Sequence, residues 1–200
     1  MRKTLDHLIS WTGLVLAVVL LVAGGLLTYA SGFVNNNVEE QLSQQRITMP
    51  AEAAISKMSA EDQAALKPWA DGKTQMTTGD QAKAFADHYI LVHMNTSSEN
   101  RTYEEVSGEY MKLSKDPNAN KDEVAALGNL RQTLFMGNTL RGMLLNAYAF
   151  GTMATIAGIA GIGAFIGAAL LLVLALLGFR HAKTVQETHP TGGVREPARV

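Results

Sequence analysis

The sequence predicts an all-α integral membrane protein with two transmembrane helices and a helical extracytoplasmic domain. No charged residue occurs between His7 and Glu39, nor between Arg141 and Arg180. Each of these windows is longer than the roughly 20 apolar residues that cross a bilayer as a helix. The segment between them carries apolar residues at helical intervals and no alternating run of β-branched residues bounded by turns, which predicts helices and no strands.

The overall composition excludes several classes of function. The chain has 200 residues, of which 47% are hydrophobic, and its apolar residues gather near the two ends. A net charge of -1 with scattered lysines and arginines provides no basic patch, so we expect no nucleic-acid partner. The absence of cysteine excludes disulfides, thiolate chemistry and cysteine-based metal sites.

The first apolar segment is predicted to be an uncleaved membrane anchor. Small residues at Ala30, Ser31 and Gly32 could serve a signal peptidase, but the apolar run is longer than the roughly 7 to 15 residues of a signal h-region. We therefore predict transmembrane helix 1 over residues 8–33. Trp11 and Tyr29 are about 27 Å apart on such a helix, which suits one aromatic side chain at each membrane interface.

Positive charge near the membrane segments predicts their orientation. Arg2 and Lys3 precede the first segment, and Arg180 and Lys183 follow the second. Because such residues mark the cytoplasmic side, we expect a multi-pass protein of the cytoplasmic (inner) membrane with both termini inside. Residues 1–7 would then be cytoplasmic, and residues 34–140 would form the extracytoplasmic domain with its stalk. Residues 180–200 form a short, polar segment that contains proline and glycine, which predicts a disordered cytoplasmic tail.

Helix-start signals recur through the central region. Each is a residue whose side-chain oxygen can accept a free backbone N–H, followed three residues later by a carboxylate or amide. The pairs are Ser59 with Asp62, Thr78 with Gln81, Thr102 with Glu105, and Asn120 with Glu123. From Asn120 the helical pattern continues without proline toward the second membrane segment, and Val34, Val38 and Leu42 extend the first helix outward. We therefore expect both membrane helices to continue beyond the bilayer as a stalk.

The second membrane segment, within a long helix over residues 141–179, is rich in small residues. They form a predicted helix–helix interface, which we call the small-residue seam: Ala147, Gly151, Ala154, Gly158, Gly161, Gly163, Gly167 and Ala168. Small residues let two backbones approach closely in lipid. Three interpretations stay open: packing against Ala17, Gly24 and Gly25 of the first helix, self-association of the chain, or a broken segment around residues 158–163.

A few polar residues are candidates for function. Arg141 most simply extends to the outer lipid headgroups, and the alternatives are a pair with a carboxylate of the extracytoplasmic domain or a place at the mouth of a pore. Asn146 could bond between helices or lie at the membrane interface. His88 and His93 lie near Asp87, but residues five apart point about 140° from each other around a helix, so we predict no metal site.

One resemblance covers nearly the whole chain. The segments "GDQAKAFADHYI", "TYEEVS" and "LRQTLFMGNTLRGMLLNAYAFGTMATIAGIAG" resemble a family of small actinobacterial two-span membrane proteins of unknown function. Its members often carry the label aromatic ring-opening dioxygenase. The resemblance implies a two-span cell-envelope protein. It does not extend to the dioxygenase label, because such enzymes bind iron through histidines and a carboxylate, and that set has no match here.

We therefore expect a protein that is not an enzyme and has no cofactor, metal or catalytic residue. The sequence contains no nucleophile elbow, phosphate loop, dinucleotide fingerprint or pair of catalytic acids. It would self-associate, or serve as an accessory subunit of a larger envelope complex, through the glycine- and alanine-rich helix, with membrane lipids around it. The alternatives are an oligomeric channel or pore with Arg141 and Asn146 at its outer mouth, and an extracytoplasmic ligand sensor that acts through a partner.

Overall fold

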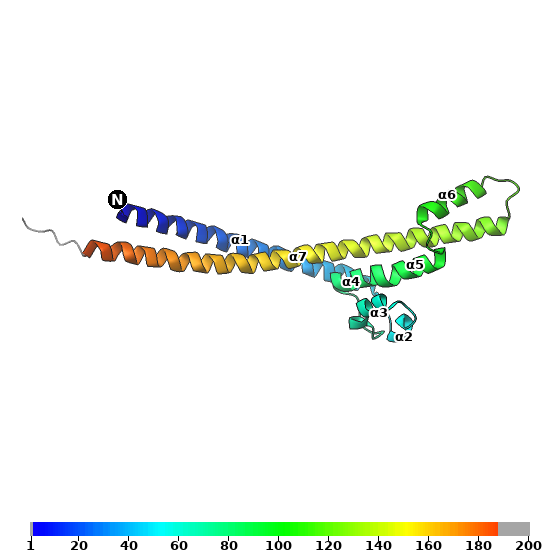
Figure 1. The fold of residues 1–200 in the computed structure, drawn as a ribbon, viewed down its shortest axis with the longest axis horizontal. Helices are drawn as coiled ribbons and strands as arrows, with labels where there is room; N and C mark the ends of the chain where they lie inside the picture. Colours follow the sequence, from blue (N-terminus) through cyan, green and yellow to red (C-terminus); the bar gives the residue numbers. More distant parts are fainter. Residues whose placement is uncertain (1, 188–200) are drawn as a thin grey trace, which may run out of the picture. The chain divides into compact units, whose positions relative to one another are not determined.

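The protein is described by a computed structural model that covers residues 2–187, and these residues form helices and no strand. The all-α prediction is thereby confirmed for the described part of the chain. In chain order the elements are α1 (Arg2–Gln45), α2 (Glu52–Ile55), α3 (Ala60–Leu66), the 3₁₀ turn η1 (Lys67–Trp69), α4 (Gly79–Phe85), the π-helical turn η2 (Ala86–Ile90), α5 (Leu91–Ser98), α6 (Tyr103–Leu113) and α7 (Lys121–Glu187), as Figure 1 shows.

The chain divides into two compact units. Unit 1 comprises residues 1–30 and 156–200, and unit 2 comprises residues 31–155. The sequence predicts a disordered tail that begins at residue 180. In the structure α7 instead continues to Glu187, and residues 188–200 lie outside the described residues.

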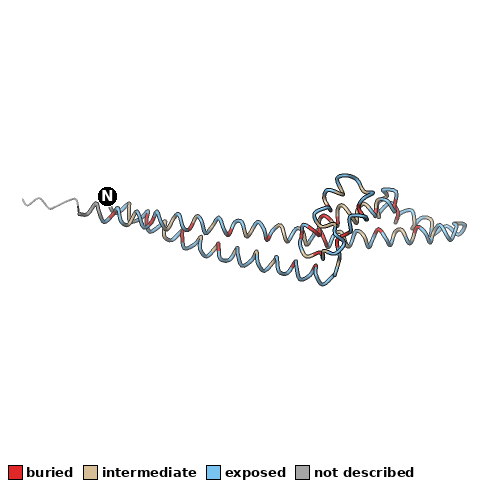
Figure 2. Tube along the Cα trace, turned by 90° about the horizontal axis from the view of Figure 1, so that it is seen from below, coloured by how far each residue is buried: buried red, intermediate tan, exposed pale blue. Residues whose placement is uncertain are grey.

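Unit 1 is an antiparallel pair of helices in which α1 and α7 lie side by side (Figure 1). The buried residues of α1 recur every seven positions, at Ser10, Ala17 and Gly24. Those of α7 do the same, at Gly161, Ala168, Ala175 and Ala182. In Figure 2 the buried positions of the two helices appear as short red segments separated by exposed and half-buried stretches. A seven-residue repeat keeps one stripe of each helix against its neighbour, and here both stripes consist of small residues.

Both long helices are long and apolar enough to cross a membrane. The candidate spans are Thr4–Gln45 and Lys121–Lys183, and 11% of the most apolar window of each is buried. Helix α7 runs without interruption through residues 158–163. The interpretation of this stretch as a broken or re-entrant segment is therefore wrong, because all its residues stay helical.

Unit 2 buries two hydrophobic clusters. In the larger one, Val38 and Leu42 of α1 and Leu144 of α7 pack with residues of the short helices and loops, among them Met49 and Leu66. The smaller one contains Met94, Val106, Leu127 and Leu134. Both long helices continue into unit 2, as their apolar residues at helical spacing predict.

The predicted helix starts are present in unit 2. Thr78 and Thr102 form complete capping boxes with Gln81 and Glu105. Ser59 accepts a bond from the backbone N–H of Asp62 at the start of α3. At the start of α7 the side chain of Asn120 accepts from the N–H of Asp122 at 2.9 Å, one residue before the expected Glu123. Such caps typically contribute about 1 kcal/mol each.

A paired loop precedes α4. The N–H of Met49 donates to the carbonyl of Thr74, and the N–H of Met76 donates to the carbonyl of Ile47, both at 2.8 Å. The sequence predicts no strand here and none forms in the described residues, but two isolated antiparallel bridges join these segments. Within the second segment, between the bridged residues Asp71 and Gln75, Gly72 adopts φ +69°, a left-handed conformation that glycine adopts without steric cost.

Candidate functional site

Part of the small-residue seam packs against α1 within unit 1. A Cβ built on Gly161 would lie 2.9 Å from Oγ1 of Thr28 and 3.2 Å from the carbonyl oxygen of Gly24. Ala168 and Ala17 are fully buried. Of the interpretations that the sequence leaves open, packing against the first helix is the one observed at these positions. The approach is close because neither backbone carries a large side chain there.

The remaining seam residues have different surroundings. In unit 2, a Cβ on Gly151 would contact the Cα of Gly79 at 3.6 Å, so this residue and the neighbouring Ala147 pack against the start of α4. Ala154 is buried, Gly158 is half-buried, and Gly167 faces Leu20 of α1. A Cβ on Gly163 would meet nothing within 4 Å. The eight residues therefore do not form one continuous interface.

The contact between α1 and α7 also continues beyond the small-residue seam, over residues 170–182. Ala175 and Ala182 are buried there, and Gly178 lies against Ser10. The signal that could have revealed them is the seven-residue interval from Gly161 through Ala168, which continues through both alanines. This interval is not apparent from the glycine content of the sequence alone, because Ala175 and Ala182 are not glycines.

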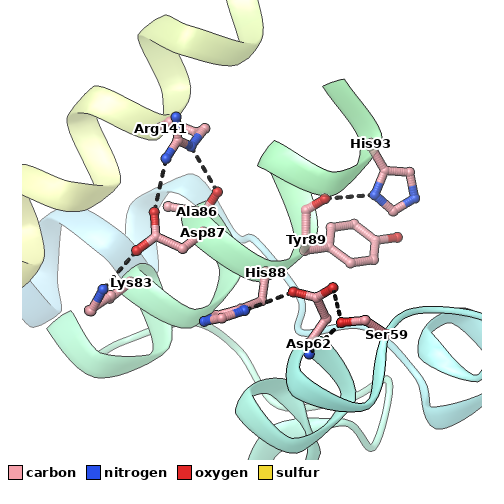
Figure 3. A network of polar contacts seen from close by, with 9 residues as sticks. All are labelled: Ser59, Asp62, Lys83, Ala86, Asp87, His88, Tyr89, His93 and Arg141. Carbon is pink, nitrogen blue, oxygen red and sulfur yellow. Dashed lines mark hydrogen bonds and ion pairs between the residues drawn. The ribbon is translucent and has the colours of Figure 1, made fainter. Parts of the chain in front are cut away.

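Arg141 forms a polar network with the π-helical turn, shown in Figure 3. Its Nη2 lies 2.9 Å from Oδ1 of Asp87, and its Nε donates to the carbonyl oxygen of Ala86 at 3.0 Å. The other carboxylate oxygen of Asp87 lies 2.7 Å from Nζ of Lys83. The sequence favours an arginine that extends to the lipid headgroups. In the structure it pairs instead with a carboxylate of unit 2, which is the second of the three alternatives.

The two cations beside Asp87 favour the ionised form of its carboxyl group. Burial raises the pKa of Asp87, but the hydrogen bonds from Lys83 and Arg141 outweigh burial and leave the pKa below its ordinary value. The hydrogen bond to Asp87 in turn raises the pKa of Lys83. The ionised carboxylate of Asp87 thereby joins α7 to α4 and η2 electrostatically.

The two histidines of this region take part in local contacts. His88 Nδ1 lies 2.9 Å from Oδ1 of Asp62, which joins η2 to α3, and His93 Nδ1 lies 2.7 Å from the carbonyl oxygen of Tyr89 (Figure 3). A hydrogen bond from Ser59, and the bond and charge of His88, lower the pKa of Asp62. Among the described residues, no three histidine, cysteine or acidic side chains are grouped closely enough to hold a metal ion.

Asn146 lines a groove between α1 and α7 in unit 2, which we call the amide groove. It has a volume of about 460 Å³, within the size range of small-molecule sites. Helix α1 contributes Phe33, Asn37, Gln41 and Gln45 to its walls, and α7 contributes Met143, Asn146 and Phe150. Nε2 of Gln41 donates to Oδ1 of Asn37. No lining residue carries a charge.

The α1 side of the amide groove was not predicted from the sequence. The available signal was the four-residue spacing of Phe33, Asn37, Gln41 and Gln45, which places all four on one face of a helix. An amide offers both donors and acceptors, so this face can bind a neutral polar group from several directions.

Comparison with known proteins returns no relative. No protein-family profile matches the chain, and no curated protein or solved structure matches it. Function is therefore inferred from the residues and their geometry.

Proposed function

We propose that the protein is a non-enzymatic integral membrane protein of the cell envelope, an accessory subunit of a larger membrane complex or a self-associating chain. One observation carries the membrane assignment: unit 1 faces its small residues inward and its large apolar residues outward. Leu26 is 65% exposed, Ile159 66% and Leu170 61%, while the alanines and glycines between the helices are buried.

This arrangement is stable in lipid and unfavourable in water. Two helices with large apolar side chains on their outer faces would expose far more contiguous apolar surface than the few hundred Å² usual for a soluble monomer. In a bilayer the acyl chains cover that surface, and close contact between small residues holds the helices together. The antiparallel helix pair of unit 1, which we call the hairpin, thus has the properties of a membrane anchor.

The orientation follows from charge. Arg2 and Lys3 lie at the start of α1, and Arg180 and Lys183 lie near the end of α7. These cations favour the cytoplasmic side for both ends of the hairpin. Unit 2, which has its own hydrophobic clusters and charged surface, would then lie outside the cytoplasm.

Exposed groups of the hairpin and of unit 2 support association with another chain. Gly161 and Ala168 already contact α1, whereas a Cβ on Gly163 would meet nothing within 4 Å, so a second helix can approach α7 at Gly163. In unit 2, Phe135 and Met136 of α7 are more than half exposed. The pore alternative has less support, because the Arg141 charge is paired with Asp87. The sensor alternative is favoured by the amide groove.

The experiment that tests this function is native mass spectrometry of the full chain after gentle extraction from its own membrane. A discrete homo-oligomer supports self-association, and a stoichiometric complex with another envelope protein supports the accessory role. A chain found only as a monomer without protein partners argues against both. Release of the chain from membranes by alkaline carbonate contradicts the membrane assignment itself.

A further inference from the structure

We infer that the amide groove of unit 2 binds one membrane lipid that has an uncharged, hydrogen-bonding headgroup. This inference rests on the proposed insertion of unit 1 in the membrane. It deepens the sensor alternative by naming the ligand class. Three properties of the groove carry it: the chemistry of its walls, the absence of charge, and the order of its residues along the two helices.

The walls combine apolar and amide side chains. Phe33 and Phe150 are 60% and 55% exposed, and Val38 and Leu42 below them are buried in the larger cluster of unit 2. An acyl chain laid over this floor removes apolar surface from water on both sides of the contact. The amides Asn37 and Asn146 offer donors and acceptors beside it.

The lack of charge selects the headgroup. Phosphate groups in proteins are typically held by arginine, lysine or a helix N-terminus, and the groove contains none of these side chains. Glu39 points to another side of α1 at 100° per residue. Glu40 is exposed beside the Phe33 edge of the groove, where its negative charge repels an anionic headgroup, and Arg141 is paired with Asp87. A hydroxyl-bearing or glycosyl headgroup therefore fits the walls better than a phospholipid headgroup does.

Along α1 the order of the residues matches the orientation of a lipid. On each helix the groove residue nearest in sequence to unit 1 is a phenylalanine, Phe33 on α1 and Phe150 on α7. Farther along α1 follow Asn37, Gln41 and Gln45, and the last lies about 18 Å from Phe33 along the helix. An outer-leaflet lipid has the same polarity, with its acyl chains toward the membrane and its headgroup away from it.

The test uses the full chain in nanodiscs that contain equal amounts of diglucosyl diacylglycerol, which is neutral, and phosphatidylglycerol, which is anionic. Native mass spectrometry after release from the nanodisc counts the lipids that stay bound. We expect the wild-type chain to retain one diglucosyl diacylglycerol in preference to phosphatidylglycerol. Retention of no lipid, or a preference for phosphatidylglycerol, would overturn the inference.

A change of selectivity separates a binding role from a structural one. Asn146→Lys places a cation in the groove, and we expect it to shift the ratio of neutral to anionic lipid by about fivefold toward phosphatidylglycerol. Asn36→Lys is the matched control, because Asn36 is exposed on α1 and points away from the groove, and its ratio should equal that of the wild type. Equal shifts in both variants would contradict a site in the groove.

Two further outcomes keep the inference separate from the proposed function. If the chain resists carbonate extraction but retains no neutral lipid, the membrane assignment stands and the lipid site is wrong. If Phe150→Asp leaves lipid retention unchanged and abolishes an oligomer of the wild type, the occupant of the groove is a second copy of the chain and not a lipid. Loss of retained lipid in Phe150→Asp, with the carbonate result unchanged, supports the inference.

Discussion

Arg141 is the residue that ties α7 to the middle of unit 2. Its guanidinium bonds both the carboxylate of Asp87 and the carbonyl of Ala86, and the side chains of the ion pair are only 21% and 23% exposed. A partly buried pair is screened less by solvent than a surface pair, and removal of one partner leaves the other incompletely satisfied. Asp87 would keep Lys83 as its second partner.

We therefore predict that Arg141→Ala lowers the free energy of unfolding of unit 2 by about 1 to 3 kcal/mol. Arg141→Lys should lose less, because it keeps the charge although it loses the separate donor that bonds the carbonyl of Ala86. Denaturant unfolding of the detergent-solubilised chain, followed by hydrogen exchange in α4 and α5, measures the difference. Lys112→Ala, at an exposed position on α6, serves as the control. Equal stability of Arg141→Ala and this control would show that the pair contributes nothing.

We predict that the stability of the turn formed by residues 71–74 depends on pH through Asp71. Backbone N–H groups of Thr74 and Lys73 and the hydroxyl of Thr74 donate to its carboxylate, and they lower the pKa of Asp71 to about 2. Because this value lies below that of an unfolded aspartate, the stabilisation is complete above about pH 4 and is lost as the pH falls toward 2. The amide resonance of Thr74 should titrate in this range in the wild type and not in Asp71→Asn, which keeps an acceptor oxygen. An unchanged titration in that variant would assign it to another group.

At the scale of elements, the pairing of α1 with α7 in unit 1 depends on which glycine faces the neighbour. Gly161 and Gly24 approach each other so closely that a Cβ on either would lie 3.2 Å from a carbonyl oxygen of the other helix. Gly163, two residues further along α7, has open space. Gly161 and Gly163 belong to the same predicted seam, so they form a matched pair of test positions.

We predict that Gly161→Ala destabilises the hairpin by about 1 to 3 kcal/mol, because a backbone atom must move to admit the methyl group. Gly163→Ala should leave hairpin stability within about 0.5 kcal/mol of the wild type. Thermal unfolding in detergent, monitored by circular dichroism, compares the two Tm values. Should Gly163→Ala prove the more damaging, the face of α7 that contacts α1 would be the one that carries Gly163 and not the one that carries Gly161.

At the scale of the whole molecule, the features that could be predicted from the sequence are those that depend on residues close together in the chain. Thr78 and Thr102 begin helices because a hydroxyl and a residue three positions later satisfy backbone groups within one turn. The partner of Arg141 was not predictable, because Asp87 is 54 residues away and reaches it through a π-helical turn that has no simple sequence signature. The buried Ala175 was missed for a different reason, since a single alanine among leucines does not stand out unless the seven-residue interval is followed.

The absence of cysteine from the chain allows a direct test of its topology, because each introduced cysteine is then the only thiol. Lys115 is exposed in unit 2, Lys183 is exposed near the end of α7, and Val18 is 51% exposed on the outer face of α1 in unit 1. If unit 2 lies outside and both termini lie inside, a membrane-impermeant maleimide should label Lys115→Cys in intact cells and Lys183→Cys only after the membrane is permeabilised. Val18→Cys should resist labelling until detergent replaces the lipid, because a thiol in hydrocarbon is neither solvated nor readily ionised. Labelling of Val18→Cys in intact membranes would show that water reaches the outer face of the hairpin, and labelling of Lys183→Cys in intact cells would reverse the orientation.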